Sequence, residues 1–157
     1  LAGSEYLQAV HGRVAGRPAI DLGLEKGVQE LCRRAIAESV VRSAHDCSDG
    51  GLAVALAECC IQGSIGFRGQ VALPRRWDVA LFGERQSRIV VTLPSGNLPR
   101  LRRLAAELSV PALALGVTGG ERLQLGRYSG RRAVGLDVPL QEARDAWATG
   151  LEGISGV

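Results

Sequence analysis

Apolar residues recur at helical spacing in several stretches of the chain, and these stretches predict helices. The longest follows Asp21, a suitable N-cap, and runs to about Val41 with charged residues on its opposite face. Residues 52–61 are apolar almost all round, which predicts a buried helix that ends at Gly63. Shorter helices are predicted at 4–11, at 77–82, at 98–108 after an Asn97 cap, and from Pro139, with Leu140, Ala143, Ala146 and Trp147 facing inward.

Alternating apolar and polar residues predict strands between these helices. The clearest alternation starts at Ile65 and continues through Phe67, Gly69, Val71 and Leu73. Further strands are predicted at 43–46, 87–93, 111–117, 122–125 and 131–138. Because Gly119 and Gly120 lie between two of these stretches, we expect a hairpin that joins 111–117 to 122–125.

The mixed order of helices and strands predicts an α+β fold, layered and with a mixed sheet, rather than a doubly wound parallel sheet. Its βαββαβ portion indicates a ferredoxin-like element. The sequence contains no Met and begins at Leu1, which favours a piece of a longer protein. We therefore expect residues 1–20 to be a lead-in segment from an upstream domain and residues 21–157 to form a C-terminal α/β domain.

Charge and composition disfavour several classes of protein. The formal net charge is +3, acidic residues are interspersed with the arginines, and aromatic residues make up only 4% of the chain, which disfavours nucleic-acid binding. No apolar run reaches the length of a membrane span, so membrane insertion is not expected. The four cysteines contain no C-x-x-C pair and are interpreted as reduced thiols of a cytoplasmic protein.

The densest polar cluster, residues 44–52, lies between the predicted strand at 43–46 and the helix that follows. A helix N-terminus offers unpaired N–H groups, and Gly50 and Gly51 permit close approach of the backbone, so phosphate binding is physically reasonable there. Asp46 and Asp49 are suited to hold Mg²⁺ beside a phosphate, and His45 to orient a ligand or exchange a proton.

The same cluster also permits a purely structural interpretation. Ser48 or Asp49 would then cap the helix while the glycines form a tight turn. The cluster is not a P-loop, because the Lys and the preceding Gly of that motif are missing. Cys47 is interpreted as a small packed residue rather than a nucleophile, and Glu84 with Arg85 as a surface pair of little energetic weight.

Four stretches, in chain order, carry a resemblance to a known family: LAGSEY at 1–6, SAHDCSDGGLAVALAE at 43–58, ALFGERQSR at 80–88, and the Val-Pro strand with its Gly-x-x-Gly-Gly turn at 110–125. Together they resemble the C-terminal part of the phosphoribosylformylglycinamidine synthase family in its small, glutaminase-free form. This family belongs to the superfamily related to aminoimidazole ribonucleotide synthetase. Ala2 stands where the family tends to have Gly.

The resemblance implies the C-terminal α/β domain of that superfamily and an ATP-dependent C–N ligase of purine biosynthesis. The implied reaction amidates formylglycinamide ribonucleotide with ammonia derived from glutamine, using ATP and Mg²⁺. Implied partners are upstream domains of the same polypeptide, a separate glutaminase subunit and a small accessory subunit. No catalytic residue is assigned, because the family's catalytic residues are expected upstream of Leu1, and the chain alone is expected to be inactive.

The resemblance carries over one set of residues as a phosphate- or nucleotide-facing turn: His45, Asp46, Ser48, Asp49, Gly50 and Gly51. Metal ligands stay unassigned. Two alternatives remain open, a structural, assembly or auxiliary nucleotide-binding module, and another ATP-dependent enzyme of the superfamily, similar to selenophosphate synthetase or thiamine-monophosphate kinase. The Leu-Phe-Gly-Glu segment at 81–84 argues against the second alternative.

Overall fold

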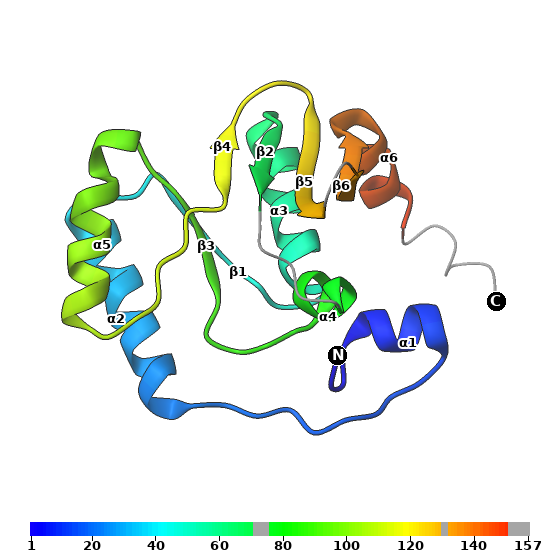
Figure 1. The fold of residues 1–157 in the computed structure, drawn as a ribbon, viewed down its shortest axis with the longest axis horizontal. Coiled ribbons are helices and arrows are strands. Elements are labelled where there is room, and N and C mark those ends of the chain that lie inside the picture. Colours follow the sequence, from blue (N-terminus) through cyan, green and yellow to red (C-terminus); the bar gives the residue numbers. More distant parts are fainter. Residues whose placement is uncertain (71–75, 130–131, 151–157) are drawn as a thin grey trace. The chain divides into compact units, whose positions relative to one another are not determined.

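The computed structural model describes residues 1–70, 76–129 and 132–150 (Figure 1). The chain divides into two compact units. The first unit contains Leu1–Ala55 and Trp77–Ala114, and the second contains Leu56–Arg76 and Leu115–Val157. None of the helices in the described ranges is long and apolar enough to cross a membrane.

Each unit contains both helices and strands. The first unit holds α1 (Glu5–His11), α2 (Leu22–Ala37), β1 (Ser43–Asp46), α4 (Trp77–Phe82), β3 (Ile89–Thr92), the 3-10 turn η1 (Ser95–Asn97) and α5 (Leu98–Glu107). Helix α3 (Gly51–Gly63) begins in the first unit and continues into the second. The second unit adds β2 (Phe67–Gln70), β4 (Gly116–Thr118), β5 (Arg122–Ser129), β6 (Arg132–Pro139) and α6 (Leu140–Thr149).

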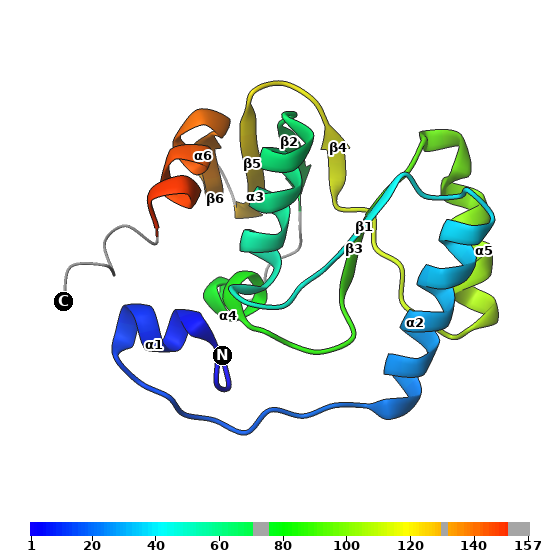
Figure 2. The same ribbon diagram turned by 180° about the vertical axis from the view of Figure 1, so that it is seen from behind.

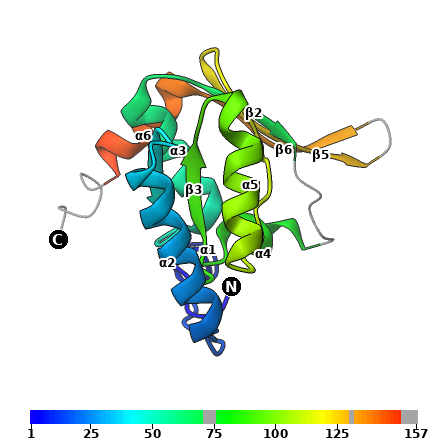
Figure 3. The same ribbon diagram turned by 90° about the vertical axis from the view of Figure 1, so that its left-hand side faces the viewer.

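The core of the first unit lies between two helices and a pair of strands. β1 and β3 are antiparallel, with His45 opposite Val90. Figure 3 shows α2 and α5 side by side, with β3 between them in this view. The buried side chains that join them are Ala35, Val40, Leu101 and Leu104. The helix predicted at 98–108 therefore turns one face inward, on which Leu101, Leu104 and Ala105 are buried.

Helix α2 begins where the sequence predicts, because Asp21 caps it. The Asp21 carboxylate accepts hydrogen bonds from the N–H groups of Gly23 and Leu24, at 2.9 and 3.0 Å. The helix ends at Ala37, before the predicted Val41. Ser39 adopts a left-handed φ of 53°, and the chain then turns Val40 into the core.

Replacing Asp21 by Ala is expected to lower the free energy of unfolding by about 1 kcal/mol, because two helical N–H groups lose their acceptor. Asp21→Ser, which keeps a capping oxygen, is the matched control and should recover most of the stability. Urea denaturation measures both changes. Equal stability of Asp21→Ala and the unmodified protein would show that the cap contributes nothing.

The second unit is built on a four-stranded mixed sheet in the order β4-β2-β5-β6. β2 is antiparallel to β4 and parallel to β5, and β5 is antiparallel to β6. Figure 2 shows α3 and α6 on one face of this sheet, and the Arg144 guanidinium donates to Ser64 Oγ at 3.1 Å. The predicted α+β class with a mixed sheet is confirmed, and the βαββαβ order is divided between two sheets.

The predicted hairpin at Gly119-Gly120 is wrong. β4 and β5 are not neighbours, because β2 lies between them. The Gly66 N–H donates to the Gly120 carbonyl at 2.8 Å, and the Gly119 N–H donates to the Gly66 carbonyl at 2.7 Å. The glycine pair thus passes over the start of β2, and β4 includes only the end of the predicted 111–117 strand.

Two side-chain predictions also need correction. Asn97 does not cap α5 through its side chain, and its amide instead donates to the Val40 carbonyl at 2.9 Å. Trp147 is 62% exposed, so it does not face inward with Leu140, which is buried. Val71 and Leu73, predicted to extend the strand at Phe67, lie outside the described residues.

Candidate functional site

The candidate site is the connection from β1 to α3, residues 46–51, which we name the 46–51 turn. Its position follows from the pairing of β1 with β3, which sets Asp46 opposite Ile89. The Cys47 N–H then donates to the Arg88 carbonyl at 3.0 Å. The turn therefore lies beside residues 83–88, the connection from α4 to β3, which we name the 83–88 segment.

Both glycines of the turn are required by close packing. Gly50 and Gly51 have φ angles of 73° and 69°, which side-chain-bearing residues rarely adopt. A Cβ on Gly51 would lie 2.9 Å from the carbonyl oxygens of Gly83 and Leu81. The Gly51 N–H donates to the Ser48 carbonyl at 3.0 Å and the Gly50 N–H to Glu84 Oε1 at 2.9 Å. Both amides of the predicted phosphate-facing backbone thus have partners within the chain.

A cavity of about 400 Å³ opens beside the turn within the first unit. Asp46, Ser48 and Asp49 line it, as does Cys47 between them. His45, Gly50 and Gly51 are not among its lining residues. His45 Nδ1 instead lies 2.7 Å from the Asp46 carbonyl oxygen, where it donates a hydrogen bond. The structure therefore places three of the six predicted residues in the lining of the cavity.

The rest of the cavity wall is also charged, and most of its charged side chains already make hydrogen bonds within the chain. Glu84 accepts hydrogen bonds from two backbone amides, and Glu25 accepts from Ser87. Within the part of the chain that the structure describes, the carboxylates of Asp46 and Asp49 have no hydrogen bond or ion pair, nor does the Arg85 guanidinium. These exposed groups are the ones available to a ligand.

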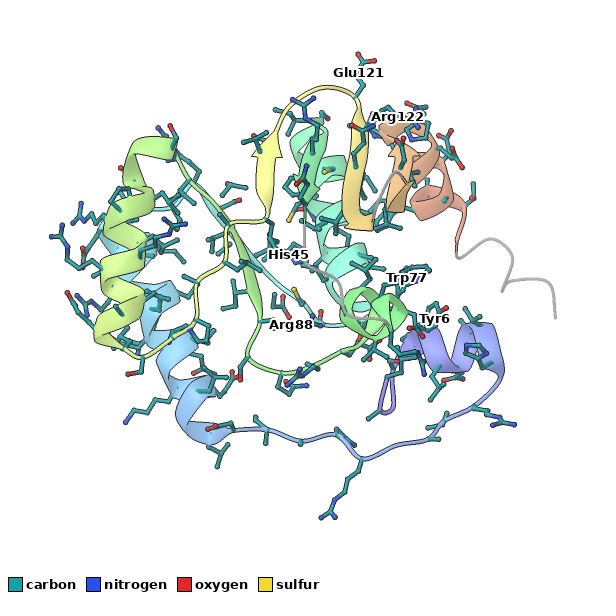
Figure 4. All side chains as sticks on the ribbon, viewed as in Figure 1. Tyr6, His45, Trp77, Arg88, Glu121 and Arg122 are labelled. Carbon is teal, nitrogen blue, oxygen red and sulfur yellow. The ribbon has the colours of Figure 1, made fainter. Side chains whose placement is uncertain are left out.

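Arg88 connects the 83–88 segment to the end of α4 through hydrogen bonds. Its guanidinium donates to the carbonyl oxygens of Ala80, at 3.3 Å, and of Gly83. Burial lowers the pKa of the Arg88 guanidinium. Figure 4 shows Arg88 at the start of β3, in the same unit as the labelled His45 of β1. Arg88 thus acts on the backbone that forms the cavity wall rather than presenting its whole charge to a ligand.

Residues 1–6 complete the wall. The Tyr6 ring stacks on Phe82 with centroids 4.7 Å apart (Figure 4). Ser4 is buried and caps α1, and Ala2 and Gly3 line the cavity. Three of the four stretches that carry the family resemblance, 1–6, 43–58 and 80–88, therefore meet at one cavity.

Sequence reasoning missed the roles of Glu84 and Glu25. The sequence favours a surface pair of Glu84 with Arg85, whereas the Glu84 carboxylate accepts hydrogen bonds from the N–H groups of Glu5 and Gly50. Glu25 lies on the charged face of α2 and gave no local signal. Ser48 bonds the Gly51 amide through its carbonyl oxygen, and no side-chain bond from Ser48 or Asp49 to the helix is present among the described residues.

Glu25 offers a direct check of the cavity wall. Hydrogen bonds from Ser87 Oγ at 2.6 Å and from Gln29 Nε2 at 2.7 Å hold the pKa of Glu25 below its ordinary value. Ser87→Ala is expected to raise that pKa, as measured by NMR titration of the carboxyl group. The stabilisation from this contact is present above the ordinary pKa of Glu25 and lost as pH falls through the lowered one. An unchanged pKa in the variant would contradict the contact.

A metal cage made of protein alone is not present in the described residues, which contain no group of three or more His, Cys, Asp and Glu side chains suited to hold an ion. Mg²⁺ commonly uses one or two carboxylates and completes its shell with water and substrate phosphates. Asp46 and Asp49 fit that second arrangement by chemistry and by exposure.

Comparison with known proteins shows the family to which the chain belongs. Residues 1–126 match the family described as AIR synthase related protein, C-terminal domain. The match covers well over half of the chain, so the chain belongs to this family.

Two individual relatives show which proteins the chain resembles along nearly its whole length. The chain is 45% identical over 165 residues to "Phosphoribosylformylglycinamidine synthase subunit PurL" of Anaeromyxobacter sp. (strain Fw109-5), covering 98% of this chain and 21% of that protein. It is 45% identical over 156 residues to the protein of the same description from Thermomicrobium roseum, covering 96% of this chain and 20% of that protein. The chain thus spans about a fifth of the length of these relatives.

Solved structures share the fold. "Structure of PurLQS from Thermotoga maritima" aligns with a TM-score of 0.66 at 21% identity, over 90% of this chain and 24% of that chain. "T. maritima PurL complexed with AMPPCP" aligns with a TM-score of 0.65 at 25% identity, over 82% of this chain and 24% of that chain.

Proposed function

We propose that this chain is the C-terminal part of a phosphoribosylformylglycinamidine synthase and serves the ATP-dependent amidation of formylglycinamide ribonucleotide in purine biosynthesis. The observation that carries the proposal is the 45% identity over 98% of the chain to a relative described as that enzyme's subunit PurL. The meeting of three resemblance stretches at one cavity supports it, because residues spread over the chain are used to build a single site.

The cavity's part in this function is to face the phosphates of a magnesium nucleotide. Its lining combines the exposed carboxylates of Asp46 and Asp49 with the exposed guanidinium of Arg85. A bare anion is disfavoured beside two unpaired carboxylates, whereas Mg²⁺ bound to a polyphosphate matches both kinds of charge. When bound, Mg²⁺ would neutralise phosphate charge, with Asp46 and Asp49 as its protein ligands and Arg85 contacting phosphate oxygens.

The remaining machinery comes from outside these residues. We propose that upstream domains supply the catalytic residues, that residues 1–20 lead in from those domains, and that the chain alone does not turn over. A glutaminase subunit delivers ammonia and a small accessory subunit completes the assembly, in the cytoplasm. The description "PurLQS" of a Thermotoga maritima structure with this fold supports a multi-subunit assembly.

The test is ammonia-dependent, ATP-driven amidation of formylglycinamide ribonucleotide. The assay compares this chain alone, the separately produced upstream part alone, and their mixture, with ADP release and product formation followed together. Activity only in the mixture is the expected result, because the proposal divides the site between the two parts.

Two results would overturn parts of the proposal. Amidation by this chain alone would contradict the assignment of the catalytic residues to upstream domains. A folded, associated mixture that turns over neither ATP nor the ribonucleotide would instead favour a different reaction of the superfamily or a purely structural domain.

A further inference from the structure

We propose that Glu84 is a positioning residue that holds the 46–51 turn in its ligand-facing conformation and joins it to the start of α1. Both hydrogen bonds that Glu84 accepts come from backbone amides, so it acts on the site through the backbone. The inference rests on the proposed nucleotide role of the cavity for its kinetic test, and on geometry alone for its structural test.

A single carboxylate oxygen of Glu84 accepts hydrogen bonds from both the 46–51 turn and the start of α1. Glu84 Oε1 accepts a hydrogen bond from the Gly50 N–H at 2.9 Å and another from the Glu5 N–H at 2.8 Å. The donors lie 34 and 79 residues from Glu84 in the sequence, so a single atom ties three distant segments together. Hydrogen bonds to an ionised acceptor are stronger than neutral ones, which suits an atom that must hold two segments at once.

The geometry of the turn explains why a restraint by Glu84 is needed. Gly50 and Gly51 both have positive φ angles, and glycine is the residue with the greatest freedom to leave that conformation. The side chains of Asp46 and Asp49 are exposed and make no contact that would fix the turn from outside. The Glu84 bond to the Gly50 amide therefore restrains the second half of the turn by a side-chain hydrogen bond, beside the close packing of Gly51 against the Gly83 carbonyl oxygen.

The start of α1 shares the same restraint. Ala2 and Gly3 line the cavity just before α1, and the stacking of Tyr6 on Phe82 holds the helix against α4. The Glu5 amide, at the start of α1, donates to the same Glu84 oxygen that accepts from the turn. Loss of the carboxylate is therefore expected to loosen two walls of the cavity together, with little effect on the distant core of α2 and α5.

Two variants separate position from charge. Glu84→Gln keeps an oxygen that can accept both amide bonds but removes the charge, and Glu84→Met removes both acceptor and charge while preserving side-chain length. Glu142→Gln and Glu142→Met, at an exposed residue of α6, are the matched controls. All variants are made in the full-length synthase, which includes the proposed upstream domains.

The kinetic readout is the separation of KM for ATP from kcat at a temperature where every variant is folded. In Glu84→Met the KM for ATP is expected to rise about tenfold, the effect on the 46–51 turn of losing the charge-assisted hydrogen bond to the Gly50 amide, with kcat changed far less. Glu84→Gln should stay within about threefold of the unmodified protein, because its oxygen still accepts both bonds. A Gln variant as impaired as the Met variant would mean that the charge itself contacts the ligand, which would overturn the positioning role.

Backbone amide exchange gives a readout that does not depend on the proposed function. In Glu84→Met, exchange should become faster at the amides of Gly50 and Glu5 and stay unchanged in α5, while Glu84→Gln should keep both amides slow. Unchanged exchange at both amides in the Met variant would overturn the inference even if ATP kinetics changed. Faster exchange at both amides in an enzyme that shows no ATP-dependent amidation would support the inference and reject only the proposed function.

Discussion

Gly51→Ala is expected to lower the free energy of unfolding by about 3 kcal/mol and to remove nucleotide binding at the cavity. Roughly 1 to 2 kcal/mol of this loss comes from the φ angle of 69°, because an L residue in the left-handed region is strained. The remainder comes from contact, since the new Cβ would lie 2.9 Å from the carbonyl oxygens of Gly83 and Leu81. Both carbonyl groups belong to the backbone, so the backbone itself must shift to make room.

Gly120→Ala is the matched control for this substitution. Gly120 has the same φ of 69°, but a Cβ there would meet nothing within 4 Å. The control should therefore cost only the conformational strain, about 1 to 2 kcal/mol, and leave the cavity intact. Chemical denaturation of both variants measures the difference. Equal losses of stability would contradict the close approach of the 46–51 turn to the end of α4.

Leu81→Ala is expected to lower the free energy of unfolding by about 2 to 5 kcal/mol, the usual cost of removing a buried leucine side chain. Leu81 is fully buried in α4, and its carbonyl oxygen faces Gly51. The cavity left behind would also loosen the helix that precedes the 83–88 segment. Nucleotide affinity should therefore fall together with stability.

Leu113→Ala provides the control for that substitution, since it deletes the same atoms at a site that is 74% exposed. Its effect should stay within about 0.5 kcal/mol. Thermal denaturation followed by circular dichroism compares the two variants. A loss at Leu113 as large as that at Leu81 would contradict the assignment of Leu81 to the core.

Local signals in the sequence predicted the elements that depend on local physics. The boundary of α2 follows from the Asp21 cap, and the buried character of α3 follows from its nearly continuous apolar run. The mixed order of elements predicted the α+β class correctly. The 46–51 turn was also identified, because a short strand, two glycines and a buried helix are all visible in sequence.

Features that depend on contacts between distant residues were missed. A Gly-Gly pair between two strands looks the same whether the strands pair or a third strand separates them, so the hairpin at Gly119-Gly120 was predicted wrongly. Glu84 looked like a surface residue because its two amide donors lie far away in the sequence. Trp147 fits the inner face of a helix by periodicity, yet α6 leaves it exposed.

The central claim is that the 46–51 turn faces a magnesium nucleotide through Asp46 and Asp49, and calorimetric binding of the ATP analogue AMPPCP tests it most directly. The comparison uses the full-length protein, the Asp46→Asn and Asp49→Asn double variant, and Glu121→Gln as an exposed charge control. With Mg²⁺ present, the double variant should bind at least about tenfold more weakly, while the control binds normally. Without Mg²⁺ the difference should largely disappear. Equal Mg²⁺-dependent affinity in the double variant and the unmodified protein would contradict the account.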